Sequence, residues 1–316
     1  MQDKAPWIFS KYINCCYNSK ASGLFNHFIP EDRYFARSGA MLVQQFRFDK
    51  TIIPLDIIDF LQWAKNLIDN NWYIMGFFDE YYIPAKSSYK NRHFRHSMLI
   101  YGYDDMQLFH AMGYTKERKY RSFTLTYDEF VSSIGVDFDL KNEPYVRKDI
   151  DRIEFDAFKL NPDYDFKFDL SQVYTSLTDY INSQDRGYLR QKGLVYGIDC
   201  EKEFVNYITN RKVLYLDERY SRLFMELKEL MVRRLEYLAS EQIVSQDILP
   251  EYKQICEQQK VIHMLFIKYN LTNNESIIDR LAEKMNSIIE AEKNVLPRIT
   301  DEIYACLVRK HNEEYL

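Results

Sequence analysis

The chain has 316 residues, of which 46% are hydrophobic and 28% charged, a composition typical of a globular protein that buries a sizeable core. A formal net charge of −5 argues against nucleic acid as a general partner, and no apolar run approaches the ~20 residues that span a bilayer. The N-terminal residues show no apolar signal segment and the five cysteines imply no disulfide framework, so we expect a cytoplasmic protein with no membrane partner.

The first chemically distinctive feature is the adjacent pair Cys15 and Cys16, which precedes a predicted helix over residues 19–28. One face of this helix is apolar and consists of Ala21, Leu24, Phe25 and Phe28. A cap at Asn18 or Ser19 would leave Cys16 at or just before the first turn, where the helix dipole stabilises a thiolate. Cys16 fits this register better and is the predicted nucleophile, with Cys15 as the alternative, because helix boundaries are predicted only to within a few residues.

Two further elements are predicted before the next chemical feature. A helix begins at Pro54 and shows the helical period at Leu55, Ile58, Leu61, Trp63, Ala64 and Ile68. Residues 72–78 predict a strand, which the turn-forming segment 79–84 ends. A basic loop over residues 85–95 then leads into the following element.

We predict a β-hairpin over residues 96–112, with His96 at its entry. Apolar runs at 98–101 and 108–112 form the two strands, and the residues between them supply the turn. His96 would be held at the start of the first strand. There an imidazole can act as a base towards a thiol brought to it from elsewhere in the chain.

The other histidines of this region are weaker candidates. His93 is the rival of His96, but it lies in the basic loop, and His110 lies in the middle of the second strand, where a packing role is expected. Neither they nor His96 show metal-ligand spacing with the cysteines, so no metal site is predicted.

The character of the chain changes after Gly135. A strand at 123–126 and a helix at 127–133 precede an acidic, irregular connector over residues 136–169. Beyond it the helical period dominates. Helices are predicted over 170–180, 223–238 and 277–307, the last as a single helix with a kink or break near Pro297.

Several motifs resemble one known family. The segments Phe77–Pro84 and Tyr101–Asp105, together with residues 195–199, 217–219 and 226–228, are similar to the butirosin-H-like branch of papain-fold enzymes. The resemblance implies an α+β protein with a papain-like catalytic lobe over residues 1–140 and a mostly helical region over 141–316. It also implies an acyltransferase of natural-product biosynthesis that forms an amide.

The reaction that the resemblance implies uses the residues named above. An acyl group would pass from the thioester of an acyl carrier protein to Cys16, and from there to an amine. His96 would deprotonate the thiol, protonate the departing pantetheine sulfur and deprotonate the amine. The phosphopantetheine arm would carry the substrate, and no bound cofactor is expected.

The third member of the catalytic group departs from the family pattern. Relatives place Asp or Asn on the strand after the histidine strand, where this chain has Gly113, and Ser10 stands where a glutamine of the oxyanion hole is usual. Asp79, at the end of the neighbouring strand, is the first candidate to orient His96. Asp104 and Asp105 are alternatives that more often only form turns, and a Cys–His dyad could also suffice.

Two basic stretches, residues 86–95 and 116–121, flank the hairpin and should meet at one end of it, beside His96. If the donor is a carrier protein, which is generally acidic, this local basic surface would receive it. The predicted docking residues are Lys86, Arg92, Arg95, Arg118 and Arg121.

Two other functions stay open. The same residues would serve a papain-like cysteine peptidase, and the missing Asp and Gln favour a non-catalytic binding module. Glu292 interrupts the apolar stripe of the last predicted helix. It is either a carboxylate at the helix rim or a buried acid that recognises a substrate amine.

Overall fold

The computed structural model describes residues 5–18, 24–26, 43–49, 57–134, 154–164, 166–184, 193–210 and 215–314. Contacts divide the chain into two compact units, Ala40–Tyr164 and Met1–Gly39 with Asp165–Leu316. We call them the sheet unit and the helical unit. Helices and antiparallel sheets are both present, so the protein is α+β.

The sheet unit is one antiparallel sheet with the strand order β3-β8-β4-β5-β6-β7. Its strands are β3 (Val43–Asp49), β4 (Tyr73–Asp79), β5 (Arg95–Tyr103), β6 (Leu108–Tyr114), β7 (Tyr120–Thr126) and β8 (Glu154–Leu160). The helices are α2 (Ile57–Asp69), the 3₁₀ turn η3 (Glu80–Tyr82) and α3 (Tyr127–Ser133). The predicted strand, hairpin and short helix of this region are thereby confirmed.

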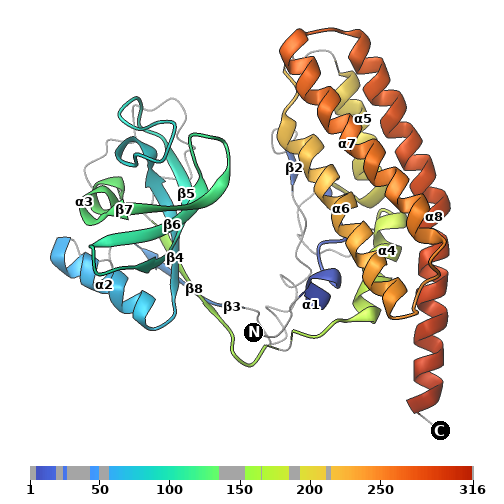
Figure 1. Cartoon of the computed structure of the whole chain (residues 1–316), viewed down its shortest axis with the longest axis horizontal. Helices are drawn as coiled ribbons and strands as arrows, with labels where there is room; N and C mark the ends of the chain where they lie inside the picture. The colour runs from blue at the N-terminus through green and yellow to red at the C-terminus, as the bar shows by residue number, and fades with distance from the viewer. Residues whose placement is uncertain are drawn as a thin grey trace. The chain divides into compact units, whose positions relative to one another are not determined.

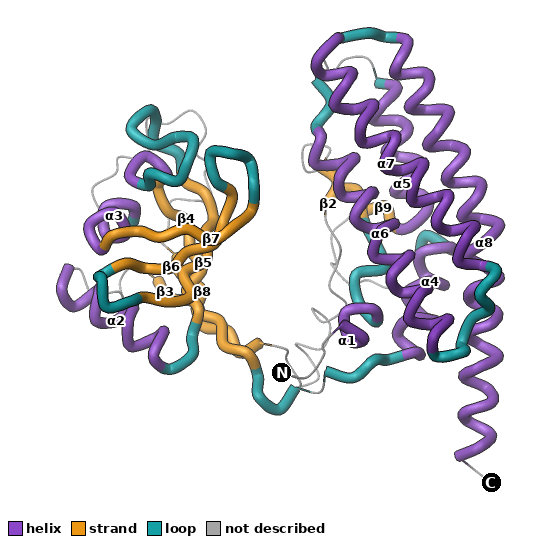
Figure 2. The backbone as a smooth tube through the Cα atoms, viewed as in Figure 1, coloured by secondary structure: helices purple, strands orange, loops and turns teal. Residues whose placement is uncertain are grey.

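Helices α2 and α3 cover one face of this sheet (Figures 1 and 2). The strands alternate, so that Ile74, Gly76 and Phe78 of β4 are buried towards the helices while the residues between them are exposed. Aromatic rings fill the layer between sheet and helices, with Phe60 of α2 stacked 5.5 Å from Phe130 of α3. Gly76 is required there, because a Cβ at this position would lie 2.4 Å from the ring of Phe155.

The helical unit has a three-stranded sheet, order β2-β1-β9, and a group of long helices. Its elements are α1 (Ala5–Phe9), β1 (Cys16–Asn18), β2 (Leu24–Asn26), α4 (Leu170–Ile181), β9 (Leu194–Tyr196), α5 (Gly197–Thr209), α6 (Glu218–Ser240), α7 (Ile248–Thr272) and α8 (Ser276–Glu314). Helices α6, α7 and α8 run side by side (Figure 2). No helix in the described part of the chain is both long and apolar enough to cross a membrane.

The last helix agrees with its predicted pattern. Residues 276–314 form one helix, α8, which is not broken at Pro297. Its apolar stripe is buried in the core of the unit, as shown by Ile277, Leu281, Met285, Ile288, Leu296, Ile299 and Ile303.

The prediction of a helix over residues 19–28 is wrong where the structure describes them. Leu24–Asn26 is the strand β2, and Cys16–Asn18 is the strand β1, which pairs with both β2 and β9. Cys16 therefore lies within a strand and not at a helix start. Its partner Tyr196 is far away in sequence, so local periodicity could not reveal this pairing.

The division of the chain also differs from the expected boundary between residues 140 and 141, which lies outside the described residues. Strand β8 lies within the predicted connector, yet it pairs with β3 and β4 and so completes the sheet. The N-terminal segment pairs through β1 with β9 and belongs with the helices. Both departures come from pairing between strands that are distant in sequence.

Candidate functional site

His96 is held by a buried carboxylate. β4 pairs with β5 so that Phe78 lies opposite His96, and the next turn, η3, starts with Glu80. Oε1 of Glu80 lies 3.1 Å from Nδ1 of His96. The histidine side chain is 37% exposed and the glutamate side chain 6% exposed, so the imidazole can meet a substrate while its partner is shielded from water.

The charge of Glu80 is stabilised by its neighbours. Burial alone would raise the pKa of this carboxyl, but the hydrogen bond with His96 and the charge of Lys86 bring the pKa below its ordinary value. Ser88 adds a hydrogen bond from its hydroxyl to Oε2, 3.2 Å long. An ionised Glu80 accepts a hydrogen bond from an Nδ1–H group of His96, and this favours the neutral tautomer in which Nε2 carries no proton.

Asp79, the predicted partner of His96, pairs with His93 instead. Its Oδ2 lies 2.6 Å from Nδ1 of His93, and its Oδ1 accepts hydrogen bonds from the backbone N–H groups of Tyr81 and Phe94. Asp79 thus fixes both ends of the loop between β4 and β5, and the ring of Tyr81 stacks on His93 at 4.3 Å. The carboxylate that contacts His96 belongs to Glu80, the residue next to the predicted one.

The sequence contains a weak signal for this arrangement. Asp79 and Glu80 are adjacent acids at the end of a strand, and His93 and His96 stand near the start of the next one. Two imidazole–carboxylate pairs could therefore have been expected, but which acid meets which histidine depends on the strand register.

The other acidic candidates form a turn. Oδ1 of Asp104 accepts hydrogen bonds from the N–H groups of Met106 and Leu108, and its Oδ2 lies 3.0 Å from Nε2 of His110. His110 is paired with this turn and is not merely a packing residue. Asp105 is exposed beside it.

Cys16 is fully buried in β1, and its neighbour Cys15 is equally buried. Cys15 donates its thiol hydrogen to the carbonyl oxygen of Gly197, the first residue of α5, at 4.0 Å. It also interacts with Cys200, a thiol whose pKa burial raises well above its ordinary value. These three cysteines belong to the helical unit, whereas His96, Glu80 and Asp79 belong to the sheet unit. None of the five cysteines, all of them described, forms a disulfide.

The two basic stretches come together, as the hairpin geometry predicts. The N–H of Lys116 donates to the carbonyl oxygen of Ala85 at 2.9 Å, and the ring of Tyr114, just before the second stretch, stacks 6.5 Å from His96. Arg92, Arg118 and Arg121 are exposed on these segments.

Two of the predicted docking residues, Lys86 and Arg95, are not exposed with the three arginines. Lys86 is only 3% exposed, because its ammonium turns inward to Glu80 and to the carbonyl oxygen of Tyr114. Arg95 is half-buried and donates to the carbonyl oxygen of Phe77 at 2.8 Å.

Glu292 is a buried acid, but the amine that it holds is part of the protein. Its Oε1 lies 2.6 Å from the ammonium of Lys228, which also pairs with Glu201. The hydroxyls of Tyr180 and Tyr252 donate hydrogen bonds to the carboxylate of Glu292, at 3.1 and 2.5 Å. The five residues come from α4, α5, α6, α7 and α8, one from each helix.

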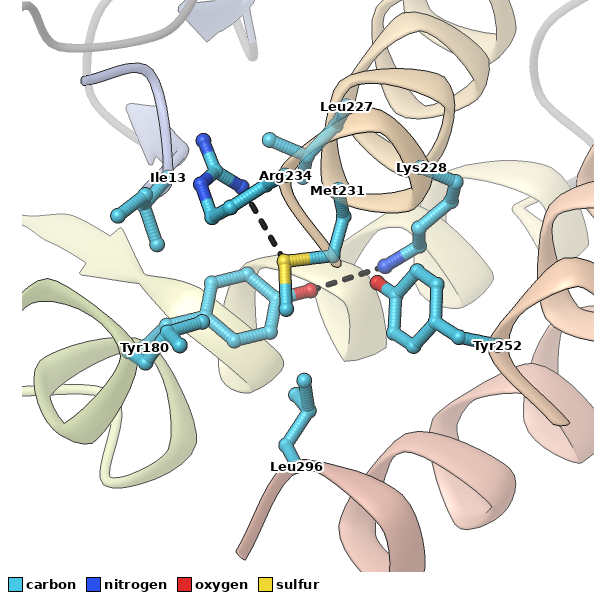
Figure 3. A pocket seen from close by; sticks show the side chains of 9 residues that line it. Ile13, Tyr180, Leu227, Lys228, Met231, Arg234, Tyr252 and Leu296 are labelled. Atoms are coloured by element: carbon cyan, nitrogen blue, oxygen red, sulfur yellow. Dashed lines mark hydrogen bonds between the residues drawn. The ribbon is translucent and has the colours of Figure 1, made fainter. Parts of the chain in front are cut away.

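The space beside this network is too small for a substrate. A cavity of about 10 Å³, the volume for one water molecule, is lined by Tyr180, Lys228, Tyr252 and Arg234 among apolar side chains (Figure 3). The guanidinium of Arg234 is itself engaged with the backbone oxygens of Phe9 and Lys11. Recognition of a substrate amine by Glu292 is therefore not supported by this geometry.

Within the described ranges, no group of three or more His, Cys, Asp or Glu side chains is arranged to hold a metal ion. Comparison with known proteins adds no assignment: no family model matches the chain, and no curated protein matches it.

Proposed function

We propose that the protein is a cysteine-dependent acyltransferase that moves an acyl group from a carrier-protein thioester to an amine. The observation that carries the proposal is the His96–Glu80 pair, a half-exposed imidazole whose Nδ1 is held 3.1 Å from a buried carboxylate. A carboxylate in this position fixes the tautomer and stabilises the imidazolium that forms during proton transfer. The resemblance of the sequence motifs to butirosin-H-like enzymes supports the thioester and the amine as substrates.

The proton balance of the reaction requires one base that acts twice. The thiol proton passes to the imidazole as the cysteine sulfur attacks the thioester carbonyl, and the imidazolium returns that proton to the departing pantetheine sulfur. The amine then attacks the acyl-cysteine carbonyl, loses a proton to the imidazole, and the cysteine thiol is restored. We assign the base to His96, with Cys16 as the nucleophile predicted from the sequence.

We propose a smaller docking surface for the donor than the sequence alone predicts. Arg92, Arg118 and Arg121 are exposed on the two basic stretches, which the hydrogen bond from Lys116 to Ala85 joins beside the His96 strand. We propose these three arginines as the surface that binds an acidic carrier protein. Lys86 and Arg95 are left out of that surface because their side chains turn to partners inside the unit.

One observation favours a second function, a non-catalytic binding module. Cys15 and Cys16 are both 0% exposed, and burial of this kind is typical of inert structural thiols. A catalytic thiol must become accessible to the thioester, whereas a binding module has no such requirement.

Intact-protein mass spectrometry separates the two functions. We expect incubation with an acyl-pantetheine thioester to add the mass of the acyl group to the wild-type protein, and a subsequent amine to remove it as an amide. A Cys16→Ala variant should remain unmodified. Absence of any adduct and of any amide, with both pantetheine and carrier-bound thioesters, would reject the acyltransferase and leave the binding module.

A further inference from the structure

Lys86 is a cation buried beside the His96–Glu80 pair. The residue is 3% exposed, and its ammonium lies 3.5 Å from Oε1 of Glu80. The same ammonium donates to the carbonyl oxygen of Tyr114 at 2.7 Å and lies 5.2 Å from the ring centre of Phe123. It therefore joins the loop after β4 to the end of β6.

A glycine makes room for this ammonium. Gly113 of β6 lies against Lys86, and a Cβ at that position would come within 3.0 Å of the Lys86 nitrogen. Ordinary Cβ contacts are longer, so a larger residue at position 113 would push the ammonium away. Gly113 has no exceptional backbone angle, and its role is one of space alone.

The charges of Lys86 and Glu80 depend on each other. Burial disfavours each charged form on its own, lowering the pKa of the lysine and tending to raise that of the glutamate. Each charge offsets this penalty for the other. Removing the ammonium would leave a buried carboxylate with His96 and Ser88 as its remaining hydrogen-bond partners, and such a carboxylate tends to take up a proton.

We propose that Lys86 is a positioning residue that keeps Glu80 ionised and fixed against His96, and that Gly113 is the position that admits its ammonium. Lys86 acts through Glu80 and does not touch the substrate. The effect on catalysis rests on the proposed acyl transfer, whereas the effect on the charge of Glu80 does not.

The test is a titration of the Glu80 carboxyl followed by carbon NMR, which needs no substrate. In Lys86→Met the midpoint should move upward by about one to two pH units, the size expected when a close opposite charge is lost. Lys86→Arg, which keeps the charge, should restore most of the wild-type titration. Lys119→Met, at an exposed lysine of the neighbouring turn, should leave it unchanged. An unchanged midpoint in a folded Lys86→Met would overturn the proposal.

A second variant covers the case in which Lys86→Met does not fold. Gly113→Ala should raise the Glu80 midpoint in the same direction by a smaller amount, because its methyl group displaces the ammonium. Gly102→Ala is the control, since its Cβ would lie 3.6 Å from His110, an ordinary contact. If Gly113→Ala titrates like wild type, Lys86 does not control Glu80.

Activity separates this inference from the proposed function. If acyl transfer is observed, Lys86→Met should move the acidic limb of the kcat/KM profile to higher pH, and Lys86→Arg should move it back. A shifted Glu80 titration in a protein that never transfers an acyl group would reject the function and keep the role of Lys86. Normal acyl transfer together with an unshifted Glu80 titration would keep the proposed function and reject the role of Lys86.

Discussion

The ammonium of Lys228 on α6 and the carboxylate of Glu292 on α8 lie 2.6 Å apart with both side chains fully buried. A second buried carboxylate, Glu201 on α5, pairs with the same ammonium. Two carboxylates thus share one ammonium in the core of the helical unit. Oε2 of Glu201 has no hydrogen-bond partner among the described residues. Burial of an excess negative charge is costly, and this favours a proton on Glu201.

This charge balance predicts a pH-dependent stability. Burial, followed by the charge of Glu292, raises the pKa of Glu201 to about 7 from its ordinary value of 4.5, against the lowering influence of Lys228. A raised carboxyl pKa gives stability that is complete below pH 4.5 and is lost as the pH rises through 7. The loss should reach up to about 3 kcal/mol, the free-energy equivalent of the shift. Urea denaturation monitored by far-UV circular dichroism at several pH values between about 4 and 8.5 measures this loss.

Because other groups titrate in the same range, the informative quantity is the difference between variants. Glu201→Gln should show a much flatter dependence of its unfolding free energy on pH. Glu283→Gln, at an exposed position of α8, should keep the wild-type slope. An equal slope in wild type and Glu201→Gln would show that the network holds no titrating proton.

The pairing of Glu80 with His96 predicts which acid matters for catalysis. Glu80→Gln should lower kcat/KM by about 10² to 10⁴, as loss of an orienting carboxylate does in other hydrogen-bonded catalytic groups. Asp79→Asn should have a smaller effect, because it removes the charge facing His93 and retains the oxygen that accepts from Tyr81 and Phe94. Steady-state kinetics on both variants gives the order, and a larger loss in Asp79→Asn would restore Asp79 as the orienting acid.

The identity of the nucleophile can be decided by acyl loading. Cys16→Ala should abolish both the acyl adduct and amide formation, whereas Cys15→Ala should retain much of each. Cys15 bonds the carbonyl of Gly197 and contacts Cys200, so a structural role is expected for it. Cys200→Ala is the control for disturbance of that contact. Loading that survives in Cys16→Ala and disappears in Cys15→Ala would exchange the two assignments.

The basic surface predicts a difference between two donors. Reversal of Arg92, Arg118 and Arg121 to Glu should raise the apparent KM for a carrier-bound thioester steeply and weaken its dependence on salt. A small pantetheine thioester needs no docking surface and should react nearly as before. The control is the same charge reversal at Arg280, Arg309 and Lys310, exposed residues of α8. Equal losses with both donors would place the damage at the reacting groups themselves.

Local pattern was sufficient for much of this fold. Apolar runs ended by turn residues predicted the strand over 72–78 and the hairpin over 96–112, and helical periodicity predicted the helices over 223–238 and 277–307. The structure has β4, β5, β6, α6 and α8 at these places, because each buries an apolar face against the rest of its unit. The histidine at the entry of the hairpin and the meeting of the two basic stretches follow from the same reasoning. They depend only on neighbours in sequence and on the geometry of a hairpin.

Contacts between distant segments decided the rest. Cys16 was expected near a helix start but lies in a strand, because its segment pairs with the distant strand that contains Tyr196. Strand β8 pairs with β4 although it lies in the predicted connector over residues 136–169, which has no clear periodicity. The strand register selected Glu80 over Asp79 for His96, since neighbouring residues at a strand end point in different directions. The sequence predicts Lys86 on the docking surface and leaves Glu292 open between a helix rim and a buried acid for a substrate amine. Only the folded chain shows the opposite charges, on other elements, that allow both to be buried.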